Sequence, residues 1–174
     1  MIQYIFRNSW WAIRKRPKII IGFTLFDFIF EIAGLVAFLA MWIFVIATYT
    51  GLPDVIPIHY NISGQADSFG NRNSFFFLPA VATALYAVMT ILCRFPHVFN
   101  YPVKITEANA FIQYRNMVTM VRYLKLVLVL VFGFFILQMV THNGNGIGMW
   151  LLPVLLAIIV VPVIYFLVKS FMYR

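Results

Sequence analysis

The chain has 174 residues, of which 63% are hydrophobic and 10% are charged, and its mean hydropathy is +0.92. A soluble domain carries about 25% charged and about 45–50% apolar residues, so these values exclude a soluble enzyme, a disordered chain and a free nucleic-acid-binding module. The net charge is +8, but the basic residues lie at the edges of apolar runs, which indicates membrane topology and lipid headgroups as partners. The composition predicts a small all-α integral membrane protein with a single membrane domain.

The chain begins with a basic and aromatic segment, residues 1–18, in which apolar side chains recur at helical spacing. This pattern predicts a short interfacial helix in the plane of the lipid headgroups. A long apolar run follows from Ile19 to Tyr49. A helix of this length exceeds the roughly 30 Å hydrocarbon core. We therefore expect it to overhang the membrane, with the span itself at 28–49.

Three further apolar runs predict membrane spans at 74–93, 124–140 and 149–168. A polar loop over residues 50–73 separates the first two spans. An amphipathic segment at 103–123 is expected to form a cytoplasmic helix that continues into the third span. Pro162 lies inside the fourth span and is expected to kink it.

The lysines and arginines determine the predicted orientation. If the N-terminus is cytoplasmic, all 13 of these residues except Arg72 lie on the inner side. Such a bias favours a multi-pass protein of the cytoplasmic membrane with both termini in the cytoplasm.

Polar residues gather in the first outer loop, which its prolines and glycines are expected to hold in an ordered shape with short strands. Asp54, His59 and Asp67 lie in this loop, and His142 lies in the second outer loop. Two imidazoles and two carboxylates in one place can bind a divalent metal or respond to pH. The alternatives are that these residues recognise a ligand or partner, or that they hydrogen-bond the loop backbone and maintain its shape. The candidate functional residues of the outer loops are Asp54, His59, Asn61, Asp67, Arg72 and His142.

The same loop carries a pattern of fixed residues: Leu52–Asp54, Ile56, Pro57, His59, Asn61, Gly64, Asp67 and Gly70. This pattern resembles the uncharacterised bacterial membrane domain found at the N-terminus of SdpI-type toxin-immunity proteins. The resemblance covers the first two spans and the loop between them. It implies an inner-membrane protein with an immunity-like role, although proteins of that type resemble six-span proteins and four spans are expected here.

Two acidic residues lie near the inner end of the first span. Asp27 and Glu31 are four positions apart, so they share a helix face on which like charges repel. Arg122 and Lys125 flank the inner end of the third span. These four residues are expected to form a charge cluster, either a structural set of salt bridges or a proton or cation site.

The chain contains no GxGxxG, P-loop, HExxH or GxSxG motif, so no cofactor or resident metal is expected. The pattern as a whole favours a membrane protein that recognises an envelope peptide, toxin or partner protein through its outer loop. A small ion- or proton-coupled transporter or transporter subunit is the alternative, and a membrane enzyme is a third possibility. Four spans are few for a carrier, so this alternative would require a homodimer.

Overall fold

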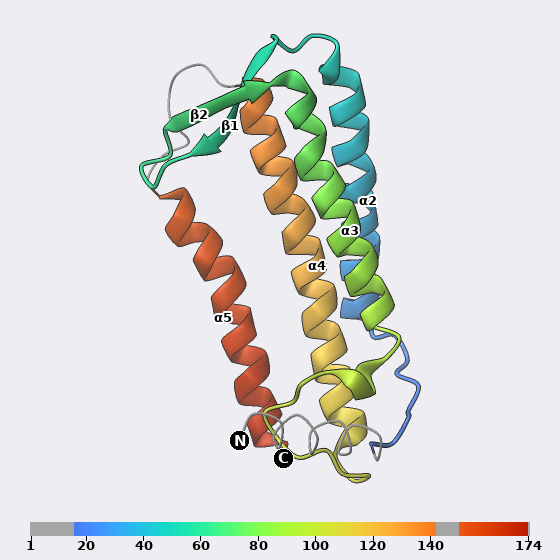
Figure 1. Cartoon of the computed structure of the whole chain (residues 1–174). Helices are drawn as coiled ribbons and strands as arrows, with labels where there is room; N and C mark the ends of the chain where they lie inside the picture. The colour runs from blue at the N-terminus through green and yellow to red at the C-terminus, as the bar shows by residue number, and fades with distance from the viewer. Residues whose placement is uncertain (1–15, 142–149, 174) are drawn as a thin grey trace, which may run out of the picture.

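The computed structural model describes residues 16–141 and 150–173. Four long helices lie side by side in this part of the chain, and each is long and apolar enough to cross a membrane (Figure 1). They are α2 (Leu25–Tyr49), α3 (Phe77–Leu92), α4 (Ala110–Thr141) and α5 (Leu151–Met172). The span of α3 includes the 3₁₀ turn η1 (Arg72–Phe76) that precedes it. Each helix overlaps one of the four predicted spans, as expected for a multi-pass membrane protein. Helix α4 begins at Ala110, within the amphipathic segment 103–123, and continues without a break through the third span. The predicted interfacial helix lies mostly outside the described residues.

The first span begins later than the sequence suggests. Residues 17–24 are not helical, and α2 begins at Leu25, so the predicted helical overhang from Ile19 is wrong. The cause is a capping box at Thr24. The Thr24 hydroxyl accepts a hydrogen bond from the Asp27 backbone N–H at 3.1 Å, and the Asp27 carboxylate accepts one from the Thr24 N–H at 2.9 Å. These bonds satisfy backbone groups that a helix end leaves free and so fix the starting point.

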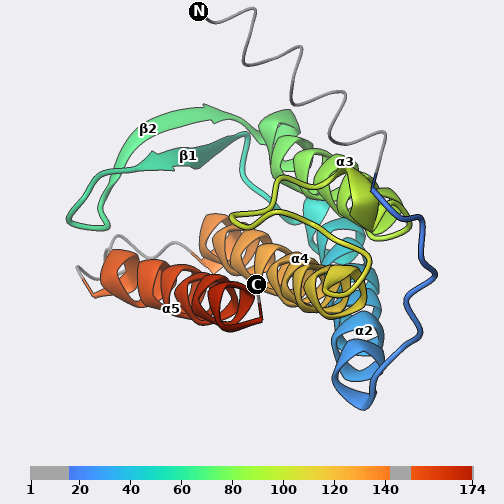
Figure 2. The same ribbon diagram turned by 90° about the horizontal axis from the view of Figure 1, so that it is seen from below.

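Helix α4 lies at the centre of the bundle. Figure 2 shows it with α5 on one side and α2 and α3 on the other, and α4 packs against all three. Two of its polar residues, Gln113 and Asn116, are buried. Gln113 Nε2 donates to the Ser170 carbonyl and Asn116 Nδ2 to the Phe166 carbonyl, both at 2.8 Å. In an apolar environment polar side chains find partners on neighbouring helices, and here the two amides hold α5 against α4.

A further hydrogen bond joins α4 to the middle of α5. Pro162 lies inside α5. Because proline has no N–H, the carbonyl of Ile158, four residues earlier, lacks its usual helical partner. The Tyr123 phenol of α4 donates to this carbonyl at 2.8 Å. The contact therefore satisfies a backbone group that the proline leaves free.

We expect Tyr123→Phe to destabilise the protein by about 0.5–2 kcal/mol, because the Ile158 carbonyl loses its donor. The same change in a Pro162→Ala background should cost clearly less, since alanine restores the helical N–H. Thermal unfolding in detergent of wild type, both single variants and the double variant measures the difference. Equal costs in the two backgrounds would contradict this role for the phenol.

Between α2 and α3 the chain forms a β-hairpin at one end of the bundle (Figure 1). Strand β1 (Val55–Tyr60) pairs antiparallel with β2 (Ala66–Asn71). The Asn61 side-chain carbonyl accepts the backbone N–H groups of Ser63 and Gln65 at 3.0 Å each, and Gly64 takes a positive φ of 78°. Such Asx hydrogen bonds and a left-handed glycine are what a tight turn requires. The short strands expected in this loop are thus present.

The base of the hairpin is anchored in the main hydrophobic core. Ile56 of β1 and Phe75 of the 3₁₀ turn η1 (Arg72–Phe76) are fully buried. Gly70 of β2 is the register partner of Ile56. A Cβ on Gly70 would lie only 3.0 Å from Ile58 Cδ1, so the Ile58 side chain packs over this glycine. The remaining buried members of this core are Met41, Val45, Leu52, Ala82, Ile136 and Met139.

Candidate functional site

The first candidate site is the ionic cluster where α2 meets α4. Arg122 Nη1 lies 3.0 Å from Asp27 Oδ1, and Arg122 Nε donates to Glu31 Oε1 at 3.2 Å. Lys125 Nζ donates to Glu31 Oε2 at 2.6 Å. The structure therefore brings together all four residues of the expected charge cluster. Two carboxylates face two cations, so the cluster carries no net formal charge.

The cluster is withdrawn from the surface and completed by hydroxyl groups. The side chains of Asp27 and Lys125 are fully buried, whereas that of Glu31 is 24% exposed. The Thr119 hydroxyl donates to Asp27 Oδ1 at 2.7 Å, and Lys125 Nζ donates to the Thr90 hydroxyl of α3 at 3.0 Å. Buried charges are tolerated when each is paired and hydrogen-bonded, and here contacts from three helices meet that condition.

Aromatic rings cover the two cations. The Arg122 guanidinium lies 4.1 Å from the centroid of the Phe23 ring, and Lys125 Nζ lies 4.6 Å from that of Tyr86. Cation–π contacts of this kind replace part of the lost hydration. Arg122 Nη1 forms an ion pair with Asp27, but the geometry of this contact is not that of a hydrogen bond. The ion pairs and hydrogen bonds of the cluster connect α2, α3 and α4.

The second candidate site lies on the hairpin. His59 Nδ1 of β1 is 2.5 Å from Asp67 Oδ1 of β2, and the two side chains are 67% and 42% exposed. The strand pairing is irregular on both sides of His59. Irregularities of this type change the direction in which side chains point. This explains why His59 contacts Asp67, which is not its register partner. The pair lies on the exposed surface of the hairpin.

Of the other outer-loop candidates, Asn61 lies in the hairpin turn, and Asp54 and Arg72 lie at the base of the hairpin. The Arg72 backbone N–H donates to the Asp54 carbonyl at 3.0 Å, and their side chains approach to 3.8 Å. Asp54 therefore pairs with Arg72 and does not join His59 and Asp67. His142 lies outside the described residues. Across residues 16–141 and 150–173, no three His, Cys, Asp or Glu side chains are grouped so that they could hold a metal ion.

A third polar centre stabilises the connection between α3 and α4 at the opposite end of the bundle. Arg16 Nη1 donates to the carbonyls of His97 and Phe99 at 3.1 and 2.6 Å, and its guanidinium lies 5.4 Å from the Tyr101 ring centroid. Burial raises the pKa of the Tyr101 phenol, which stays protonated and donates to the Pro96 carbonyl at 2.8 Å. Sequence reasoning assigned Arg16 only to the basic N-terminal segment and did not anticipate this contact.

The region that contains the hairpin matches a known family. The match is to a domain of unknown function, DUF1648, over residues 36–83, which include most of α2, the whole hairpin and the first turns of α3. The chain is also similar to an uncharacterised protein of Archaeoglobus fulgidus, with 29% identity over 105 residues. That alignment covers 56% of this chain and 57% of the relative, so the chain spans a little more than half the length of the archaeal protein. No solved structure matches the chain.

Proposed function

We propose that this protein recognises an envelope peptide, toxin or partner membrane protein through the hairpin formed by β1 and β2. One observation supports the proposal: among the described residues, the hairpin is buried at its base and exposed along its outer strand. Ile56 at the base is fully buried, whereas Asp67, Ser68 and Phe69 of β2 are exposed. A rigidly mounted, exposed strand is a pre-organised binding element, because little conformational freedom is lost when a partner docks.

The outer strand is the edge that suits a partner. β1 contains Pro57, which has no N–H, and β1 lies on the side of the hairpin that faces the helices (Figure 2). β2 contains no proline, and its pairing with β1 is regular from Phe69 to Asn71. An extended peptide can add to such an edge as a third strand, with affinity from main-chain hydrogen bonds.

The side chains on the hairpin suggest what the partner carries. Val55, Ile58 and Ile62 are large apolar residues that remain exposed, and the His59–Asp67 pair lies among them. A partner strand with apolar side chains and one polar or charged group would match this surface. The resemblance to toxin-immunity proteins makes a membrane-active peptide the first partner to test.

A photoreactive amino acid at Ser68 tests the proposal in cells. Ser68 is exposed on the outer strand, and the matched control is the same amino acid at Asn100, which is exposed at the opposite end of the bundle. We expect a defined envelope peptide or membrane protein to crosslink at Ser68 and not at Asn100. The absence of any specific adduct at Ser68, in a protein that inserts normally, would contradict the proposal.

Alanine substitutions then test the polar pair. An exposed ion pair contributes about 0–1 kcal/mol to stability, so His59→Ala and Asp67→Ala should fold normally. We expect each to reduce the crosslink at Ser68 by about fivefold or more, as loss of roughly 1 kcal/mol of contact implies. Protection of cells from a membrane-active peptide should decrease in parallel. Unchanged crosslinking and protection in both variants would leave the pair a purely structural role.

An ion-coupled carrier is the alternative function for Asp27 and Glu31. The charge balance of their cluster favours a structural role instead, because each acid already faces a cation. A cation could bind there only by displacing Arg122 or Lys125. Flux across liposomes that stays at background for protons and monovalent cations would exclude the carrier.

A further inference from the structure

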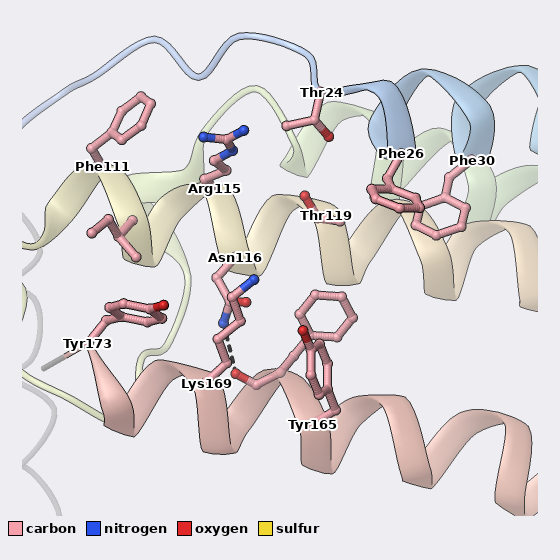
Figure 3. Close-up of a pocket in the computed structure, with 12 residues that line it drawn as sticks. Thr24, Phe26, Phe30, Phe111, Arg115, Asn116, Thr119, Tyr165, Lys169 and Tyr173 are labelled. Carbon is pink, nitrogen blue, oxygen red and sulfur yellow. Dashed lines mark hydrogen bonds between the residues drawn. The ribbon is translucent and has the colours of Figure 1, made fainter.

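A pocket of about 570 Å³ lies between α2, α4 and α5, at the end of the bundle opposite the hairpin (Figure 3). Helix α5 packs along α4, and side chains of α2, α4 and α5 line the pocket between them. The floor and walls are largely aromatic: Phe26, Phe30, Phe111, Tyr165 and Phe166. In a membrane, an apolar opening between helices faces acyl chains.

The charged residues of the pocket are both cationic. Arg115 of α4 and Lys169 of α5 both line it, and neither forms an ion pair with an acid among the described residues. Each instead lies 5.9 Å from an aromatic ring centroid, Phe111 for Arg115 and Tyr165 for Lys169. Both cations sit near helix ends, where lipid headgroups are located. Asp27, which follows the lining residue Phe26, accepts a hydrogen bond from Thr119 and is neutralised by Arg122.

The pocket also contains an unused hydrogen-bond acceptor. Asn116 lines it and is buried, and its amide nitrogen is engaged with the Phe166 carbonyl. The Asn116 Oδ1 atom accepts no hydrogen bond from the described residues. A buried carbonyl oxygen without a donor is costly, and a hydroxyl group on a bound molecule could supply one.

From this combination we infer that the pocket binds an acidic phospholipid. Its phosphate is held by Arg115 and Lys169, and the start of its acyl chains lies against the aromatic walls. Arginine and lysine are the usual partners of phosphate, and basic pockets between membrane helices bind acidic headgroups. A headgroup with hydroxyl groups, as in phosphatidylglycerol, would also provide a donor for Asn116. The predicted orientation places this site in the cytoplasmic leaflet, where acidic lipids attract basic residues.

Native mass spectrometry of the full chain in detergent tests the inference, with phosphatidylglycerol and phosphatidylcholine of identical acyl chains as ligands. We expect phosphatidylglycerol to bind about tenfold more tightly, a preference that two headgroup-contacting cations can supply. The double variant Arg115→Gln/Lys169→Gln should lose this preference. The matched control, Arg94→Gln/Lys104→Gln, removes two exposed cations that do not line the pocket and should retain it.

Two results would overturn the inference. One is an unchanged preference in the Arg115→Gln/Lys169→Gln variant while its unfolding temperature in lipid-free detergent equals that of wild type. The other is displacement of the bound lipid by glycerol 3-phosphate at equal concentration, because a site for the free phosphate would not need the aromatic walls. Neither cation is paired with a buried acid, so both single variants should also fold and allow the test to be repeated one charge at a time.

Discussion

Replacing Arg122 with methionine is expected to destabilise the protein by about 3–5 kcal/mol, because it leaves Asp27 buried without a cation. Arg122 lies between the two acids of α2 and is the ion-pair partner of Asp27. A methionine fills much of the same space but offers no charge. Thermal or denaturant-induced unfolding in detergent measures the loss. Arg94→Met is the control, since Arg94 is exposed and forms no ion pair among the described residues.

The double variant Arg122→Met/Asp27→Asn distinguishes a lost charge partner from lost packing. Asparagine removes the unpaired charge, and Glu31 keeps Lys125 as its partner. We therefore expect the double variant to recover a substantial part of the stability. If the double variant is as unstable as Arg122→Met, the guanidinium acts mainly through its packing against Phe23.

Exchanging the charges of Glu31 and Lys125 separates a structural pair from an ion-coupling site. Glu31→Lys and Lys125→Glu each place like charges side by side, whereas the combination restores an opposite pair. Recovery of folding and function together in the exchanged protein would support a structural role. Recovery of folding alone would favour an ion site, because such a site depends on which residue carries the carboxylate.

Phe75→Ala should cost about 3–5 kcal/mol and release the hairpin from the bundle. Phe75 is fully buried in the core that also contains Ile56, so its removal leaves a cavity beneath β1. Unfolding in detergent measures the overall loss. Trypsin cleavage after Arg72, at the base of the hairpin, reports on the local release and should become faster.

Phe77→Ala is the matched control for this prediction. Phe77 is two residues away on the same segment, but its side chain is 70% exposed. Its removal creates no internal cavity, so stability and trypsin cleavage should remain close to wild type. Equal effects of the two substitutions would show that the hairpin does not depend on the buried ring.

The four spans follow from the sequence alone, because a membrane helix must be long and apolar whatever its neighbours are. The start of α2 could also have been predicted from the sequence. Thr24 and Asp27 form the S/T-x-x-acid spacing of a capping box, but the surrounding apolar run hid this signal. The ordered outer loop was predictable from its prolines and glycines, whose backbone preferences are local.

The contacts between helices could be predicted only in part from the sequence. Asp27, Glu31, Arg122 and Lys125 stood out because charges are rare in membrane segments. Thr90 did not, since a threonine in an apolar helix usually hydrogen-bonds its own backbone, as Thr90 also does with the Tyr86 carbonyl. Its second role as partner of Lys125 depends on how α3 packs against α4, which is information that no local pattern contains.

The ionic cluster has a consequence for biogenesis. Glu31 and Arg122 are 91 residues apart in the chain. At a synthesis rate of roughly 5–20 residues per second, the α2 carboxylates emerge from the ribosome about 5–18 s before their cations. During that interval α2 carries two acids without partners. Until α4 arrives, nascent α2 can be accommodated if its two acids stay near the water interface, are protonated, or are shielded by the insertion machinery.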